Sequence, residues 1–144
     1  MTTMNTQIER QLDKNQWVRL GLVTAVASVL AVLIVQAIAL ALWPDIVLFK
    51  PLDSYPRSAL FTAVPTFVAT ALFAWLVVHK PRPTQTFTRI AIAVLILSFI
   101  PDYILPVPHK TLLASTVAAF MHLIAATVTI SLLVIGYRRQ TSRS

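Results

Sequence analysis

The chain has no cysteine and only two glycines among its 144 residues. Without cysteine it cannot form a disulfide, a thiolate metal site or a cysteine nucleophile. With two glycines it lacks a glycine-rich phosphate loop, and HExxH, GxSxG and Walker patterns are absent. The sequence therefore indicates a non-enzymatic protein with no resident cofactor and no metal site.

Charge is also scarce. Only 12% of the residues are charged, where an average soluble domain has roughly 25%. Hydrophobic residues make up 57% of the chain, and the mean hydropathy is +0.76. Because so little polar surface cannot cover a soluble domain of this size, the composition predicts one small integral membrane domain.

Four stretches are long and apolar enough to cross a bilayer, which takes about 20 residues at 1.5 Å each. They predict an all-α membrane protein, an up-and-down bundle of four transmembrane helices at residues 20–43, 58–78, 87–105 and 112–137. Residues 20–137 form the transmembrane domain in this interpretation, and residues 138–144 form a tail. Residues 1–19 form an N-terminal segment, either a short interfacial helix through Ile8, Leu12 and Trp17 or a frayed tail.

The third stretch is the shortest. Its uninterrupted apolar run, Ile90 to Ile100, is followed directly by Pro101 and Asp102. It crosses the bilayer if Arg89 extends its charged end toward the headgroups and Asp102 lies near the interface. A re-entrant hairpin is the alternative.

Lysine and arginine predict the orientation. Nine of them lie in the N-terminal segment, the connection near residue 80 and the tail, against Lys50, Arg57 and Lys110 in the other two connections. By the positive-inside rule both termini are cytoplasmic, which fits a bacterial inner membrane. The net charge of +7 then reflects topology and attraction to anionic lipids. It does not indicate nucleic-acid binding, since the basic residues are scattered and lack interleaved aromatics.

A short sequence motif occurs twice in the chain. Pro44-Asp45 returns as Pro101-Asp102, 57 residues later, and the same offset gives ten identities between residues 39–78 and 96–135. This pattern suggests a two-helix hairpin used twice, with each Pro-Asp pair at the outer end of a rising helix. One interpretation is that proline stops or kinks the helix and aspartate caps the next turn. The other is that Asp45 and Asp102 face each other across the pseudo-axis and bind a cation or proton.

His122 is the histidine nearest the middle of a predicted span. Its helical face carries small residues and hydroxyls, including Ser115 and Thr129, which favour close helix packing. Its imidazole either bonds a polar group of another helix, contacts a ligand or relays a proton, or ligates a haem iron. Gln36 and Ser98 are further polar residues in the spans, and Pro65 should free the carbonyl of Phe61 for Gln36 or Ser58. The candidate ligand- or ion-binding residues are therefore His122, Asp102, Asp45, Gln36 and Ser98.

Val64-Pro65 in the second span, the basic segment Lys80 to Pro83 and the segment Met121 to Ala126 resemble a family of small bacterial four-span membrane proteins, domain of unknown function 6069. The resemblance covers residues 60 to 137. It implies a four-helix topology. Members of the family often have an acidic residue before the last span and a Met-His-Leu segment within it. Asp102 and Met121 to Leu123 correspond to these here.

Three functions remain open from the sequence. The first is a binding or accessory module that recognises a lipid, a small apolar ligand or a partner membrane protein. The second is a proton- or cation-coupled transporter or channel working as a homo-oligomer. The third is a redox protein with haem on His122. Since lipid surrounds every helix of so small a bundle, we also expect membrane lipids as partners and a homodimer or larger membrane complex.

Overall fold

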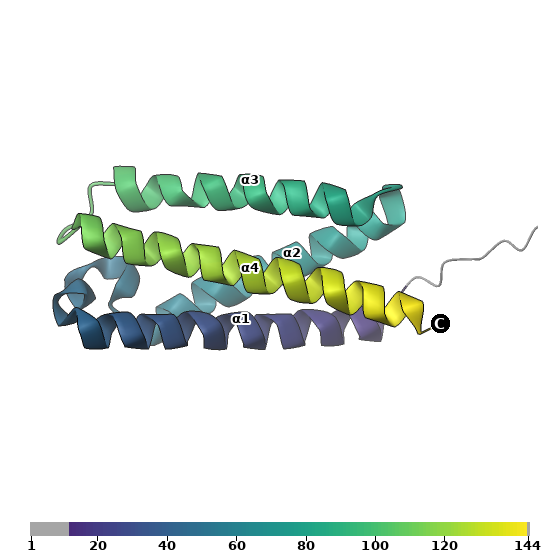
Figure 1. The fold of residues 1–144 in the computed structure, drawn as a ribbon, viewed down its shortest axis with the longest axis horizontal. Helices are drawn as coiled ribbons and strands as arrows, with labels where there is room; N and C mark the ends of the chain where they lie inside the picture. Colours follow the sequence, from purple (N-terminus) through teal and green to yellow (C-terminus); the bar gives the residue numbers. More distant parts are fainter. Residues whose placement is uncertain (1–11, 144) are drawn as a thin grey trace, which may run out of the picture.

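The computed structural model describes residues 12–143 (Figure 1). This part of the chain contains no strand and consists of helices: α1 (Lys14–Leu42), two short 3₁₀ helices η1 (Pro44–Leu48) and η2 (Lys50–Leu52), α2 (Tyr55–His79), α3 (Pro83–Ile104) and α4 (Leu112–Ser142). Each of the four α helices is long and apolar enough to cross a membrane. The predicted all-α architecture with four candidate spans is confirmed.

The four helices run up and down along one common long axis (Figure 1). Each packs against its neighbour in the chain, and α1 also packs against α4. The start of α1 and the end of α4 lie at the same end of the bundle, which we call the terminal end. Residues 43–54 and 105–111 form the opposite end, which we call the loop end.

The first and last helices of the chain, α1 and α4, extend beyond their predicted limits. The Asp13 carboxylate accepts a hydrogen bond from the backbone N–H of Gln16, whose side chain returns one to Asp13, so α1 begins at Lys14. Trp17 therefore belongs to α1 and not to a separate interfacial helix, while Ile8 lies outside the described residues. At the other end of the chain α4 continues to Ser142, since a helix can extend beyond the bilayer boundary into water.

The third span is a continuous helix of 22 residues, about 33 Å long. The re-entrant hairpin is therefore wrong. Pro101 lies inside the helix, where its missing N–H leaves only the Leu97 carbonyl without its usual donor. The helix survives this local loss because the N–H of Leu105 still bonds the Pro101 carbonyl, at 3.1 Å.

Aromatic side chains from all four helices meet at the terminal end. The Phe73 ring lies 4.7 Å from that of Phe87, 5.4 Å from Tyr137 and 5.7 Å from Trp17, centroid to centroid. Phe73 and Phe87 are fully buried. Such offset and edge-on contacts are favourable beyond their buried area, so the cluster joins the four helices where the chain begins and ends.

Hydroxyl groups join three helices farther along the interior. The Thr129 hydroxyl of α4 lies 3.0 Å from the Ser28 hydroxyl of α1 and 3.3 Å from the Thr66 hydroxyl of α2, and all three residues are buried. Between apolar helices in lipid, such hydrogen bonds and small side chains supply much of the association energy. The predicted small-residue face of the fourth helix is confirmed at Ser115, Ala118, Ala119 and Thr129, all of which are buried.

The two Pro-Asp pairs take different structures, so the predicted repeat is not reproduced locally. Pro44 and Asp45 open the 3₁₀ helix η1 after α1 has ended, whereas Pro101 and Asp102 lie inside α3. The chain then folds differently after each pair, because residues 43–53 cover the loop end while residues 105–111 lead directly to α4.

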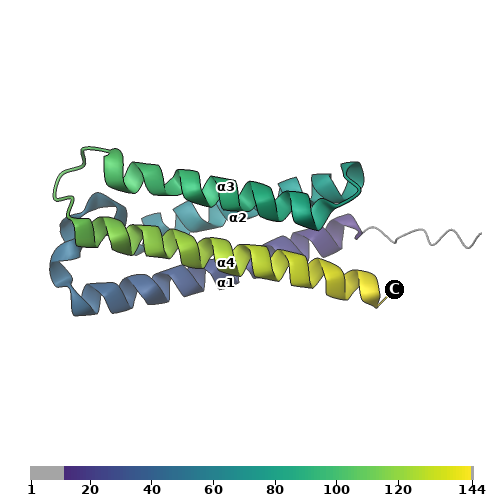
Figure 2. The same ribbon diagram turned by 45° about the horizontal axis from the view of Figure 1, so that its top comes forward.

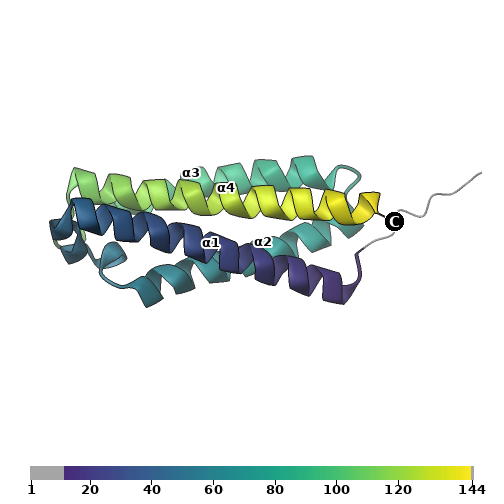
Figure 3. The same cartoon turned by 60° about the horizontal axis from the view of Figure 1, so that its bottom comes forward.

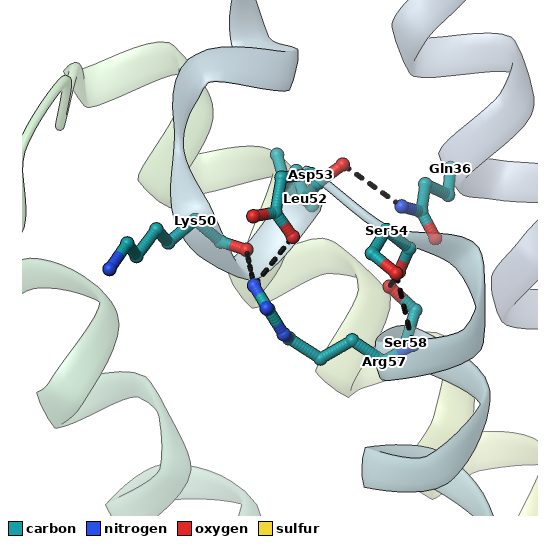
Figure 4. Close-up of polar contacts among 7 residues, drawn as sticks. All are labelled: Gln36, Lys50, Leu52, Asp53, Ser54, Arg57 and Ser58. Carbon is teal, nitrogen blue, oxygen red and sulfur yellow. Dashed lines mark hydrogen bonds and ion pairs between the residues drawn. The ribbon is translucent and has the colours of Figure 1, made fainter.

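We call residues 43–53 the plug. Ile46, Phe49 and Leu52 are spaced by three residues, the period of a 3₁₀ helix, and all three are buried in the core at the loop end. The Gln36 amide donates to the Leu52 carbonyl at 3.1 Å (Figure 4). Arg57 donates to the Lys50 carbonyl and pairs with Asp53. The plug is thus fixed to α1 and α2 by side chains.

Candidate intramembrane binding site

Asp102 and His122 lie together. Asp102 is in the last turn of α3 and is 8% exposed, and its Oδ2 atom lies 2.9 Å from Nδ1 of His122 on α4. The separation is that of an ion pair, but the contact lacks the angle of a hydrogen bond, and Oδ2 accepts none from the described residues. The carboxylate therefore retains capacity to accept a hydrogen bond.

Ser115 fixes the two helices at this point. Its hydroxyl donates to the backbone carbonyl of Asp102 at 2.6 Å, and Ser115 is 2% exposed. Ser115 precedes His122 by seven residues, or two helical turns, so both project from the same side of α4 toward α3. Because side chains lean toward the start of their own helix, those of Asp102 and His122 lean toward each other from antiparallel helices.

The imidazole is accessible although it lies on the packed side of its helix. Its side chain is 44% exposed, while Ser115, Ala118, Ala119 and Thr129, which share its helical face, are buried. Figures 1, 2 and 3 show α2 and α3 close together at the terminal end and diverging toward the loop end. Phe87 near the terminal end and Asp102 near the loop end are the buried residues of α3.

The pair lies within the apolar length of the bundle. His122 is about 22 Å from Tyr137 along α4, and Asp102 is about 18 Å from Ile90 along α3, at 1.5 Å per residue. A hydrocarbon core is about 30 Å thick. If Tyr137 and Ile90 mark one boundary, the pair lies in the half of the membrane nearer the loop end. An ionisable pair at such a depth is a candidate functional site.

The other predicted site residues lie elsewhere. The prediction that Gln36 or Ser58 bonds the Phe61 carbonyl is wrong. Gln36 donates to the Leu52 carbonyl, which the plug brings next to it, and Ser58 donates to the Ser54 carbonyl in the first turn of α2. Ser98 is half-buried and donates to the Leu95 carbonyl of its own helix at 2.6 Å. Asp45 is exposed in the plug. It does not meet Asp102, because α1 and α3 are not neighbours, and Asp45 lies in η1 beyond the end of α1 whereas Asp102 lies inside α3.

Sequence reasoning missed the Ser115 contact and the plug. The spacing of Ile46, Phe49 and Leu52 was the available signal for the plug, since three apolar residues at a period of three indicate one buried side of a 3₁₀ segment. Nothing in the sequence signalled that Ser115 bonds the Asp102 carbonyl, because that contact depends on how α3 and α4 are offset along their axes.

Within residues 12–143 no group of three or more histidine, cysteine, aspartate or glutamate side chains is placed to hold a metal ion. Asp102 and His122 are two such groups and would need further ligands from outside this chain. With Nδ1 beside the carboxylate, Nε2 is the ring nitrogen left to meet a ligand, as donor or acceptor.

One comparison with known proteins gives a match. The model of a family described as "Family of unknown function (DUF6069)" matches residues 12–139, which include α1, α2 and α3 completely and all but the last three residues of α4. Neither the curated proteins nor the solved structures contain a match.

Proposed function

This chain belongs to the DUF6069 family of unknown function, and we propose that it is a non-enzymatic membrane protein that binds a bilayer-resident ligand at Asp102 and His122. The ligand is a lipid or a small, mainly apolar molecule with one hydrogen-bonding group. It reaches the exposed part of the imidazole from within the bilayer. The observation that carries the proposal is a half-exposed imidazole beside a buried carboxylate at membrane depth.

The cost of polar groups in lipid supports this proposal. A carboxylate and an imidazole exposed to hydrocarbon each lose water without full replacement, so they are retained where a polar partner meets them. Asp102 contacts the imidazole at Nδ1, and Nε2 is the ring nitrogen left to a ligand group. The apolar surroundings would then take the rest of the ligand, as in most small-molecule sites.

The binding test compares His122→Phe, which keeps an aromatic ring of similar size, with His79→Ala. His79 is an exposed histidine bonded to its own helix at the Trp75 carbonyl. The protein is purified in mild detergent, and co-purifying lipids and small molecules are identified by mass spectrometry. We expect a defined molecule with the wild type and with His79→Ala, and its loss in His122→Phe. The same unselective lipid mixture from all three proteins would contradict the proposal.

Transport is a second candidate, favoured by the unfilled acceptor capacity of Oδ2 on Asp102, which can take a proton or a cation. In proteoliposomes a proton- or cation-coupled flux should fall in Asp102→Asn, which keeps the shape and removes the charge. No flux with wild-type protein would refute transport without affecting the binding proposal. The absorption spectrum of the same preparation tests haem ligation, since a Soret band lost in His122→Ala would be required.

We also propose the orientation of the protein in the membrane and its association with other membrane proteins. Both termini and the connection at residues 80–82 face the cytoplasm of a bacterial cell, supported by the nine lysines and arginines that the sequence carries in its N-terminal segment, around this connection and in its tail. Self-association or assembly with a partner membrane protein is supported by the many apolar side chains that the bundle leaves exposed, although lipid alone also covers such a surface.

A further inference from the structure

A pocket lies at the loop end, between the end of α1, the plug and the start of α4. It is shallow and open, with a volume of about 420 Å³. Its lining residues include the apolar Leu42, Ile46 and Leu113, together with Trp43, Asp45 and Thr111. It is distinct from the Asp102 and His122 site, since neither of these residues lines it.

Asp45 differs from the other aspartates of residues 12–143. Asp13 caps α1, Asp53 pairs with Arg57, and Asp102 contacts His122. Among the aspartates of this part of the chain, Asp45 alone has a side chain that makes no hydrogen bond or ion pair with a described residue. The cations of the loop end are occupied in part: Arg57 is held by Asp53, and the Lys110 ammonium donates to the Tyr103 and Leu105 carbonyls.

The pocket lies at headgroup depth. The long apolar helix α1 ends at Leu42, and Trp43, its C-terminal cap, is 44% exposed. Tryptophan favours the boundary between hydrocarbon and water, where its ring meets chains and its N–H meets headgroups. A ligand here can place an apolar chain against Leu42, Ile46 and Leu113 and a polar head beside Asp45.

We propose that this pocket binds an amphiphile with an ammonium headgroup. The carboxylate of Asp45 pairs with the ammonium, and the Trp43 ring adds a cation–π attraction where a cation meets an aromatic face. A phosphate or other anion is disfavoured by the negative charge of Asp45. The ligand is a membrane lipid of the phosphatidylethanolamine class or a free alkylammonium molecule, which share this chemistry.

The Thr111 hydroxyl completes the polar rim. Its oxygen accepts a hydrogen bond from the Ala114 N–H and so caps α4, which leaves the hydroxyl hydrogen to a neighbouring acceptor. In a zwitterionic lipid the phosphate that follows the ammonium could accept this hydrogen. This inference is independent of the proposed function, because it uses other residues and another part of the bundle.

The test uses full-length protein in nanodiscs of equal parts phosphatidylethanolamine and phosphatidylglycerol with identical acyl chains. Lipids retained by the protein are counted by native mass spectrometry. We expect the wild type to retain phosphatidylethanolamine about fivefold better, and Asp45→Asn to lose this preference. Asp13→Asn is the matched control, since it removes the same charge and asparagine also caps a helix.

Equal retention of the two lipids in the wild type, or an unchanged preference in Asp45→Asn, overturns the lipid assignment. A second arm titrates the protein with the dodecylammonium ion. Displacement of phosphatidylethanolamine that requires Asp45 supports the proposal. Binding of dodecylammonium that requires Asp45, without any lipid preference, assigns the ammonium site to a free amphiphile. No Asp45-dependent binding in either arm overturns the proposal altogether.

Discussion

At the scale of single residues, most polar side chains in the spans are satisfied by their own helix. Thr62, Thr66 and Thr70 each donate to the carbonyl four residues earlier, at 2.8 Å. A carboxylate cannot do this, since it has no proton to give and the carbonyls are acceptors. Asp102 must therefore rely on a group of another element, and His122 supplies the ring nitrogen that lies 2.9 Å from its carboxylate.

Thr129 tests the energetic role of the buried hydroxyls. Replacing it by valine keeps the shape but removes the contacts to Ser28 and Thr66, so we expect a loss of about 1 kcal/mol in the free energy of unfolding. The measurement is reversible unfolding in mixed micelles. Thr127→Val is the control, because Thr127 is exposed and bonds only the Leu123 carbonyl of its own helix. Equal effects of the two substitutions would refute a special role for Thr129.

At the scale of helices, hydropathy and length predicted the four spans because a membrane helix must satisfy its own backbone over about 20 apolar residues. The residues at which the helices begin and end were less predictable. The capping box at Asp13 extended α1, and Pro101, which could stop or kink its helix, lies inside α3, because a proline near a helix end costs only one hydrogen bond. The plug was missed because its eleven residues, two of them proline and three of them charged, are too few for a span.

The contact between α1 and α2 at Gly21 gives an element-scale prediction. A Cβ atom at Gly21 would lie 2.9 Å from Cγ2 of Thr70, whose hydroxyl is held by the Thr66 carbonyl. Gly21→Ala should therefore destabilise the bundle by about 1–2 kcal/mol, measured as above. Thr70→Ser removes the clashing methyl group and keeps the hydroxyl, so the double variant should recover most of the loss. Additive effects of the two changes would show that this contact is not the cause.

At the scale of the whole molecule, the sequence predicted Asp102 and His122 as candidates but not their contact. Along the sequence Asp102 belongs to the edge of its span and His122 to the middle of its own. The two meet because the start of α4 extends farther toward the loop end than the end of α3 does. This offset is fixed by tertiary packing and by the Ser115 contact. The same packing separates Asp45 from them, which no repeat in the sequence could indicate.

Orientation can be tested on this cysteine-free chain with single cysteines and no background labelling. Ser54 lies at the loop end and Thr84 near the connection at the terminal end. With the termini in the cytoplasm, an impermeant thiol reagent added to intact cells should label cysteine at Ser54 and not at Thr84, and permeabilised cells should label both. The opposite pattern would invert the proposed topology.

The central claim, that a ligand occupies the space beside His122, is tested most directly by photocrosslinking in native membranes. A diazirine amino acid is placed at Ala126, one turn from His122 on the same side of α4, and at Phe120, which is 49% exposed about 160° around the helix. Illumination should give one adduct of defined mass at Ala126, lost in His122→Phe, and a mixture of bulk lipids at Phe120. The same mixture at both positions, unchanged in His122→Phe, would contradict the claim.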